Sequence, residues 1–569
     1  MEAHDEKFGN LVYRRRQYIV PIWQREYSWG IAQWEDLWND IMKLYEKPPE
    51  EETDPSRYQA LSHFMGSIVL KPKQLGGVEK YIIIDGQQRH TTLLVLLALI
   101  REQAKKDNVA LSNTIQNSYL LNSDIKTVDE RYKLCPTEPD RLTFEKIMNG
   151  EPIIQEGRQL AYAYWFFKQK LEEKDETSNK SIDLEKLKEI IVDKLRMVEI
   201  ILDKEDDPNR IFETLNSRGL ELEEADLVRN YFMMKVRDEV EAENLYRYTW
   251  LPMQQGLRSS YNLTKFFRDY LRMDKHTHIK EEDIYPQIQK KLKFSSQVET
   301  KSELQTMKRY SEYYERLLFP ERESNTKIRK GIERLKRWDV GTAYPLLLKV
   351  YNAYLHSRTL SEDDFCQILK IIESFAVRRH FCGLKTNSLN VIFPSLCELD
   401  ESALADCLQD RLTQYQWNRR WPADEEFKEG FKKFPIYLSG NEKCRLILDS
   451  LEESLGHPEK VALEGLTIEH VMPETLDEEW QAYLGTDWKR IKNDYLHTVG
   501  NLTLIAGPPN STIQNKLFSK KKEEWYVHSH VGLTQEIAHR WSEWREVDIN
   551  ERASILAERA VKIWVYPSS

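Results

Sequence analysis

A strand and a helix that both need burial meet within residues 81–100. The apolar run of the strand stops at Asp85, and Gly86 permits the tight turn that follows. The segment 91–100 is then apolar nearly all round, which is typical of a buried helix. Just upstream, GSIVLKP and EKYIII flank a pair of glycines and predict a β-hairpin. We therefore expect residues 1–235 to form a mixed α/β domain.

The chain has 569 residues, which is too long for one compact core. Residues 236–455 show helical periodicity almost throughout, as in DDFCQILKIIESFAVRR, and strand signals are scarce there. GHPEK, at residues 456–460, is a plausible boundary. Residues 456–569 mix short strands, turns and helices. We expect three regions: the α/β domain, a helical linker or scaffold, and a C-terminal domain.

Composition argues against several classes of protein. The six cysteines include no pair at CxxC spacing, which favours reduced thiols over a zinc ribbon. The polar N-terminus shows no signal peptide, and the longest apolar stretch is far shorter than the roughly 20 residues of a membrane span. We expect a cytoplasmic protein without a membrane partner. The net charge of -10 still permits a local basic groove for nucleic acid. Homo-oligomer formation stays open, because no heptad pattern is visible.

A block of polar residues, 85–89, separates the strand from the helix. Free N–H groups and the dipole at the start of a helix favour an anion, and the forked cation of Arg89 suits phosphate oxygens. Gln87 and Gln88 could contact a base or a ribose, and Asp85 could hold a metal or cap the helix. The alternative is a capped turn with Arg89 in a salt bridge. The residues alone do not decide between the two.

Two other polar segments have the same ambiguity. In PIWQREYSW, Gln24 and Arg25 lie among aromatic residues, an arrangement that can contact phosphate and stack on a base. In NRIFETLNSRGLELEEADLVRNYF, residues 216–218 form a polar loop, and Asp226 and Arg229 lie in the next helix. The alternatives are an aromatic core edge covered by Arg25 and simple helix capping. Each alternative is the better explanation of its segment taken alone.

The three segments together resemble one family. VPIWQREYSW, FMGSIVL…YIIIDGQQRHTTL and FETLNSRG…DLVRNYF have the order and approximate spacing of the N-terminal domain of GmrS-type proteins, which has a ParB/sulfiredoxin-like fold. The resemblance covers about residues 8–235. It implies binding and hydrolysis of a nucleoside triphosphate by Asp85, Gly86, Gln87, Gln88, Arg89 and Thr91, with Gln24 and Arg25 nearby. Two residues depart from the family pattern: His90, where an apolar residue is usual, and Trp23, where tyrosine is commoner.

The C-terminal region carries a second set of polar residues. TIEHVMP places Glu469 and His470 on a short strand before a proline turn. Asn501 precedes the apolar strand LTLI, and Asn510 and Asn515 follow it. Phosphodiester hydrolysis with one metal needs a general base, which suits histidine, and oxygen or imidazole ligands for a divalent cation. A third group must hold the histidine ring in its productive orientation.

This second set resembles an HNH nuclease of the GmrD type, with a ββα-metal fold, over about residues 460–530. The implied roles are His470 as the general base, Glu469 as a metal ligand, Asn501 as the residue that orients His470, and Asn510 or Asn515 as the completion of the metal site. The cysteines of the zinc knuckle found in many HNH enzymes are absent, so we expect no structural zinc. His497 also matches the pattern, with its role open.

Basic residues near these segments are candidates for DNA contacts. Lys516 and Lys520 could bind phosphates beside the metal site, although two following glutamates make a solvated helix face nearly as good an explanation. A second basic cluster, before the first strand, comprises Arg14, Arg15 and Arg16. Its composition fits DNA contact and a solvated surface equally well.

In the helical middle, the paired arginines of ESFAVRRHFCGL could contact DNA or bridge domains. These are Arg378 and Arg379. We favour a structural role for both.

The resemblances imply a single-chain, modification-dependent (type IV) restriction enzyme of anti-phage defence. Its N-terminal domain would bind and hydrolyse a nucleoside triphosphate and sense modified double-stranded DNA, and its C-terminal domain would cut that DNA with Mg²⁺ or Mn²⁺. We expect the modified base to be cytosine carrying a hydroxymethyl, glucosyl or methyl group. Two alternatives stay open: a phosphorothioate-sensing NTPase-nickase of the same architecture, and a nucleotide-gated DNA-binding regulator with an inactive nuclease domain.

Overall fold

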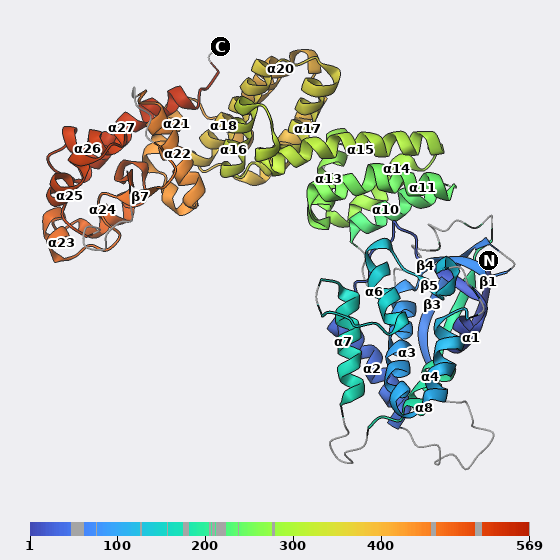
Figure 1. The fold of residues 1–569 in the computed structure, drawn as a ribbon. Helices are drawn as coiled ribbons and strands as arrows, with labels where there is room; N and C mark the ends of the chain where they lie inside the picture. Colours follow the sequence, from blue (N-terminus) through green and yellow to red (C-terminus); the bar gives the residue numbers. More distant parts are fainter. Residues whose placement is uncertain are drawn as a thin grey trace. The chain divides into compact units, whose positions relative to one another are not determined.

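The computed structural model describes residues 1–46, 62–74, 77–123, 125, 128–155, 157–173, 181–203, 206, 211, 223–236, 238–275, 279–456, 462–506 and 515–567. They fall into two compact units, Met1–Leu251 with Lys291–Leu304 and Pro252–Lys290 with Gln305–Ser569 (Figure 1). The expected boundary near residue 456 lies inside the second unit, and the division into three regions stays a prediction. No helix in the described ranges has both the length and the apolar character needed to cross a bilayer.

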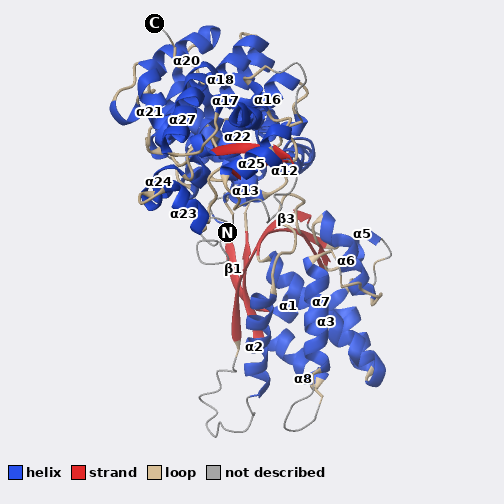
Figure 2. Ribbon diagram, turned by 90° about the vertical axis from the view of Figure 1, so that its left-hand side faces the viewer, coloured by secondary structure: helices blue, strands red, loops and turns tan. Residues whose placement is uncertain are grey.

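A six-stranded mixed sheet with the order β1-β6-β3-β4-β2-β5 forms the framework of the first unit (Figure 2). β3 and β4 pair antiparallel, which confirms the predicted hairpin, although residues 75–76 of its turn lie outside the described ranges. β6 runs parallel to β3, and β2 runs parallel to β4. The strands are β1 Glu2–Lys7, β2 Arg16–Ile19, β3 His63–Gln74, β4 Glu79–Asp85, β5 Leu134–Cys135 and β6 Leu195–Ile201.

Helices cover both faces of this sheet. On one face α3 is buried nearly all round, as its composition predicts. It begins at Gln87, because Gly86 ends the strand with a left-handed backbone (φ 94°). On the other face, Leu227 and Met234 of α10 pack on the apolar side chains of β3, β4 and β6. The helices are α1 Phe8–Tyr13, α2 Ile31–Glu46, α3 Gln87–Asp107, α4 Val109–Ile115, α5 Val128–Arg131, α6 Glu138–Asn149, α7 Gln159–Glu172, α8 Leu184–Glu189, α10 Glu224–Lys235 and α11 Glu239–Leu245.

The second unit is helical over most of its length, which confirms the predicted helical middle region. Its central helix α18 carries Arg378 and Arg379, both buried. Arg378 donates to Trp564 O (2.6 Å) and Asp424 Oδ1 (2.7 Å), so this arginine has the structural contacts that we expected. The helices wholly or mostly in this unit are α12 Leu251–Leu257, α13 Ser260–Lys275, α14 Ile284–Leu292, α15 Gln297–Leu318, α16 Thr326–Trp338, α17 Tyr344–Asn352, α18 Glu362–Phe381, α19 Leu389–Ser395, α20 Leu404–Thr413, α21 Asp424–Lys433 and α22 Asn441–Glu453.

A two-stranded antiparallel sheet follows these helices. His470, the last residue of β7, pairs with Leu502, the first residue of β8. Two helices lie between the strands in the sequence, and α25 comes after β8. The elements are β7 Leu466–His470, α23 Glu478–Leu484, α24 Trp488–Tyr495, β8 Leu502–Ala506, α25 Phe518–Glu524, α26 Gly532–Arg540 and α27 Glu546–Ile563. The mixed α/β class with a helical middle is thus confirmed, whereas the ParB-like and ββα-metal assignments stay predictions.

Candidate functional site

A cavity of about 710 Å³ opens at the end of β4, where α3 begins. It is lined by most of the residues expected at a nucleotide site, namely Gln24, Arg25, Asp85, Gly86, Gln87, Gln88 and Arg89. Thr91 does not line it. Its hydroxyl donates to Gln87 O (2.7 Å), one helical turn back, and so supports the start of α3. The structure therefore brings two segments together, 24–25 and 85–89, that are distant in sequence.

Two glycines make room for this arrangement. A Cβ at Gly86 would lie 2.9 Å from Ser67 O, so β3 and the turn before α3 approach each other too closely for any residue with a Cβ. A Cβ at Gly66 (φ 93°) would lie 1.8 Å from Arg89 NH1. Arg89 crosses the backbone there, donating to Met65 O (2.8 Å) and to Asp85 Oδ2 (3.2 Å). Arg89 thus forms the salt bridge of the alternative interpretation and still lines the cavity.

The three glutamines that line the cavity make hydrogen bonds to the surrounding backbone. Gln24 Nε2 donates to Ile83 O (2.8 Å) and Ile84 O (3.0 Å) of β4. Gln88 Oε1 accepts from Ser28 N (2.8 Å), and Gln87 Nε2 donates to Arg25 O (3.2 Å). We expected Gln87 and Gln88 to contact a base or a ribose. The structure instead uses most of their amide groups to fix the 24–28 segment against α3.

Two residues of α10, Arg229 and Asn230, also line the cavity. Both are buried, and Arg229 Nε and Asn230 Oδ1 have no hydrogen-bond partner among the described residues. Arg229 NH2 lies 2.7 Å from Asp226 Oδ1. The sequence placed Arg229 only in a helix, although the motif DLVRN already contained both residues. The loop 216–218 lies outside the described residues.

Arg25 faces the same cavity, and burial is the main cause that lowers the pKa of its guanidinium. His90 does not line it. The His90 ring is fully buried, 4.6 Å from the Tyr18 ring and 5.5 Å from the Phe8 ring, and its nitrogens have no partner among the described residues. Burial lowers its pKa to about 3. The departure from the family pattern at His90 is therefore a core substitution.

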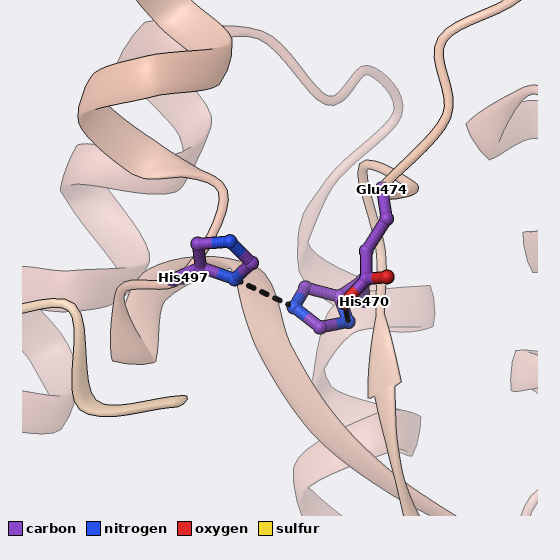
Figure 3. A group of neighbouring side chains, drawn as sticks. All are labelled: His470, Glu474 and His497. Atoms are coloured by element: carbon purple, nitrogen blue, oxygen red, sulfur yellow. Dashed lines mark hydrogen bonds and ion pairs between the residues drawn. The ribbon is translucent and has the colours of Figure 1, made fainter. Parts of the chain in front are cut away.

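The second site lies at the end of β7. His470 Nε2 is 3.3 Å from His497 Nδ1, and His470 Nδ1 is 3.9 Å from Glu474 Oε1 (Figure 3). One ligand atom from each of the three residues lies within 4.8 Å of the other two. His497 thereby gains a place in the site, and Glu474 joins it as a residue that the sequence did not indicate. Its position four residues after His470 is the signal that could have suggested it.

His470 is buried, whereas His497 is half-buried. His470 is 9% exposed, and burial, His497 and Lys521 lower its pKa to about 4. Burial also lowers the pKa of His497, while the carboxylate of Glu474 opposes that shift. A histidine with a lowered pKa is neutral at pH 7, and its free lone pair can accept a proton or bind a metal.

Asn501 fixes the backbone near both histidines. It is fully buried, and its Nδ2 donates to Met472 O (2.9 Å) and to Leu496 O (3.0 Å). Its Oδ1 accepts from Met472 N (2.8 Å). Met472 follows His470 by two residues and Leu496 precedes His497, so one side chain joins the two segments that carry the rings. The role of Asn501 in orienting the His470 ring itself stays a prediction.

Glu469 is placed differently from the prediction. Successive residues of a strand point to opposite faces, so Glu469 and His470 diverge. Glu469 Oε1 accepts from Lys521 Nζ (2.7 Å) and from Tyr526 OH (3.1 Å), and Lys521 is fully buried. The carboxylate expected at a metal is thus part of a buried ion pair. The carboxylate beside the imidazole is that of Glu474.

Two protein-family domains match the chain, and each matched range contains one of the two candidate sites. The N-terminal domain of GmrSD restriction endonucleases matches residues 8–233, and the C-terminal domain of GmrSD restriction endonucleases matches residues 421–559. The chain belongs to this family. The predicted family is thereby confirmed, and its two domains suggest a restriction endonuclease. No curated protein matches the chain.

The remaining predicted residues of the GmrSD C-terminal domain are spread out. Asn510 lies outside the described residues. Asn515 is exposed, and its backbone carbonyl accepts from Trp480 Nε1 (3.2 Å). Lys516 pairs with Glu524 (2.6 Å), whereas Lys520 is exposed.

The arginine cluster of the GmrSD N-terminal domain also differs from the prediction. Arg16 is 8% exposed and pairs with Glu199 and with Glu79 (3.0 Å). Arg14 pairs with Glu199 (3.2 Å), and only Arg15 is exposed. The buried carboxylate of Glu199 on β6 thus pairs with Arg16 of β2 and with Arg14, which directly follows α1. Arg16 is too buried to contact DNA, and DNA contact by Arg14 and Arg15 stays a prediction.

Proposed function

We propose that this GmrSD chain is a metal-dependent DNA endonuclease, with His470 as the general base and with His497 and Glu474 as ligands of a divalent cation. The observation that carries the proposal is the convergence of the three side chains at the end of β7. A bound cation would neutralise the scissile phosphate and acidify its water. The carboxylate of Glu474 suits Mn²⁺ or Mg²⁺, and Mg²⁺ usually needs only one or two carboxylates because it keeps several waters.

The chain's own groups supply the rest of the chemistry. His470 lies within hydrogen-bond distance of His497 and beside Glu474, so the base and both ligand groups share one surface. His470 would take the proton of the attacking water. Asn501 would keep the two rings in register through Met472 and Leu496.

Mn²⁺ binding to matched glutamate variants tests the choice of ligands. We expect Glu474→Gln to weaken Mn²⁺ binding in calorimetry. Glu469→Gln should instead lower stability, because it disturbs the pair with Lys521. The ligand assignment is wrong if Glu469→Gln, and not Glu474→Gln, weakens Mn²⁺ binding in a protein that unfolds at the wild-type temperature.

We further propose that the cavity of the first unit binds and hydrolyses a nucleoside triphosphate that controls cutting. Its anionic groups would lie against Arg25, Arg89 and Arg229 and the free N–H groups at the start of α3. The atoms of Arg229 and Asn230 that have no partner among the described residues support this, because buried polar groups are costly unless a partner such as a ligand satisfies them.

Nucleotide binding to Arg229→Ala and Arg89→Ala proteins tests the pocket. A lost hydrogen bond to a charged group costs about 1.5–3 kcal/mol, so each variant should bind triphosphate about 10- to 100-fold more weakly. Arg15→Ala, which removes an exposed arginine that does not line the cavity, is the control. Wild-type affinity in both pocket variants would rule the pocket out.

We propose modified cytosine as the recognised base. Cleavage of one plasmid prepared with hydroxymethyl, glucosyl, methyl, phosphorothioate or no modification, with and without nucleotide, separates the candidates. Cutting of the cytosine-modified forms supports the proposal. Nicking of the phosphorothioate form alone would favour the NTPase-nickase, and binding without any cutting would favour the regulator with an inactive nuclease domain.

A further inference from the structure

Tyr437 contacts both histidines of the nuclease centre. Its ring is stacked on that of His497, with the two planes 6° apart and the centroids 5.4 Å apart. It meets His470 edge-on, at 4.4 Å and 76°. Its backbone N also donates to His497 O (3.3 Å). Tyr437 lies in the short 3₁₀ helix Ile436–Ser439, outside the strand β7 and the segment before β8 that carry the two histidines.

Besides the bond from Tyr437 N to His497 O, this 3₁₀ helix has anchors away from the two histidines of the centre. Ile436 is fully buried, and Ser439 Oγ lies 2.8 Å from Nε2 of His380 on α18. The His380 ring also packs at 4.8 Å from the ring of Phe434. The position of Tyr437 is therefore set by the helical region, so its ring offers a fixed surface to the two imidazoles.

The ring of Tyr437, rather than its hydroxyl, makes the contacts with the histidines. Rotation of an imidazole about its Cβ–Cγ bond has only broad preferences, so the contact between His470 and His497 does not by itself fix either ring plane. Stacked and edge-on aromatic pairs with centroids 4.5–7 Å apart favour defined relative orientations. Tyr437 makes one contact of each kind and thus restrains both rings at once.

We propose that Tyr437 is the positioning residue of this centre. Its ring holds the imidazole of the cation ligand, His497, and that of the general base, His470, at their 3.3 Å separation. The inference rests on the proposed function of the centre, because it concerns how the ligand and the base are kept in register. No role for Tyr437 follows from the HNH resemblance of residues 460–530, which begins after it.

Calorimetric titration of the full chain with Mn²⁺ tests the proposal without depending on cleavage. Tyr437→Leu removes the flat ring, and Tyr437→Phe keeps it without the hydroxyl. Loss of a residue that orients a metal ligand typically weakens binding about 10- to 100-fold, which is the effect expected for Tyr437→Leu. Tyr437→Phe should bind like wild type. Tyr354→Leu is the matched control, because Tyr354 is a half-buried tyrosine of the same unit whose ring packs on Phe365 (5.6 Å).

Each outcome decides between a ring contact and its alternatives. Wild-type Mn²⁺ affinity in Tyr437→Leu overturns the proposal, and so does an equal loss in Tyr437→Phe, which would assign the effect to the hydroxyl. If Tyr437→Leu fails to fold, Tyr437→Met fills similar space without a flat face and should show the same loss. If the wild-type chain binds no Mn²⁺, or if His497→Ala binds it normally, the proposed centre itself fails.

Discussion

Replacing Asn501 by alanine should destabilise the nuclease centre more than any other single asparagine change there. The side chain is fully buried and makes four hydrogen bonds. Its amide nitrogen donates to Met472 O and Leu496 O, and its oxygen accepts from Met472 N and from Trp544 Nε1 (3.0 Å). Alanine satisfies none of these partners.

The size of the effect follows from the groups left unpaired. A buried polar group that loses its partner costs about 1–3 kcal/mol, and four groups that relax together give a loss of about 3–5 kcal/mol in the free energy of unfolding. Asn515→Ala is the control, because Asn515 is exposed and a surface change usually stays within about 0.5 kcal/mol. Both asparagines were candidates for the same site, so the comparison separates a buried structural amide from an exposed one.

Urea unfolding combined with hydrogen exchange at β7 and β8 measures this difference. Local exchange is needed because two compact units need not unfold together. We expect Asn501→Ala to lose protection at both strands and to cut DNA slowly, since His470 and His497 would lose their common tether. Equal unfolding midpoints and equal protection in the Asn501→Ala and Asn515→Ala proteins would refute this reasoning.

Three further predictions concern buried ionisable groups. His90→Leu should reduce the loss of stability in acid, because burial lowers the pKa of His90 to about 3 in the folded protein, below the unfolded value of 6.5. The contribution of His90 to wild-type stability is therefore full above about pH 6.5 and falls toward pH 3, by about 2 kcal/mol at pH 5. Thermal melts of both proteins at pH 5 and 8 would reveal the difference. Arg16→Ala should destabilise the first unit by about 1.5–3 kcal/mol, because Glu199 is 1% exposed and keeps only the half-exposed Arg14 as a cationic partner. It should leave the salt dependence of DNA binding unchanged; a shallower salt slope at wild-type stability would restore Arg16 to a DNA surface. Lys521→Met should cost about 3–5 kcal/mol by stranding Glu469, and an unchanged urea midpoint would contradict the buried pair.

Sequence periodicity predicted the elements that local composition determines. The hairpin of β3 and β4, the buried helix α3 and the long helical middle all follow from runs of apolar residues. The polar residues Gln87–Arg89 interrupt the apolar pattern, yet α3 includes them, as expected for a helix that opens directly after the turn at Gly86. The grouping of segments 24–25 and 85–89 around one cavity was expected from the family resemblance and is present.

Contacts made across the fold could not be read from spacing. Glu469 was expected at a metal because it adjoins His470, but alternation along the strand directs it to Lys521, which is distant in sequence. Arg14 and Arg16 read as a basic cluster because their partner Glu199 lies on another strand. Tyr437 comes from a different element and has no motif, so only the structure brings it to the histidines.

Cleavage of glucosylated phage DNA by wild-type and His470→Ala proteins, in Mn²⁺ with nucleotide and again in EDTA, tests the central claim most directly. The account predicts that the wild-type protein cuts in Mn²⁺ and stops in EDTA. His470→Ala should still fold and bind the DNA without cutting it. Cutting by His470→Ala at the wild-type rate would show that the centre formed by His470, His497 and Glu474 is not where this protein hydrolyses DNA.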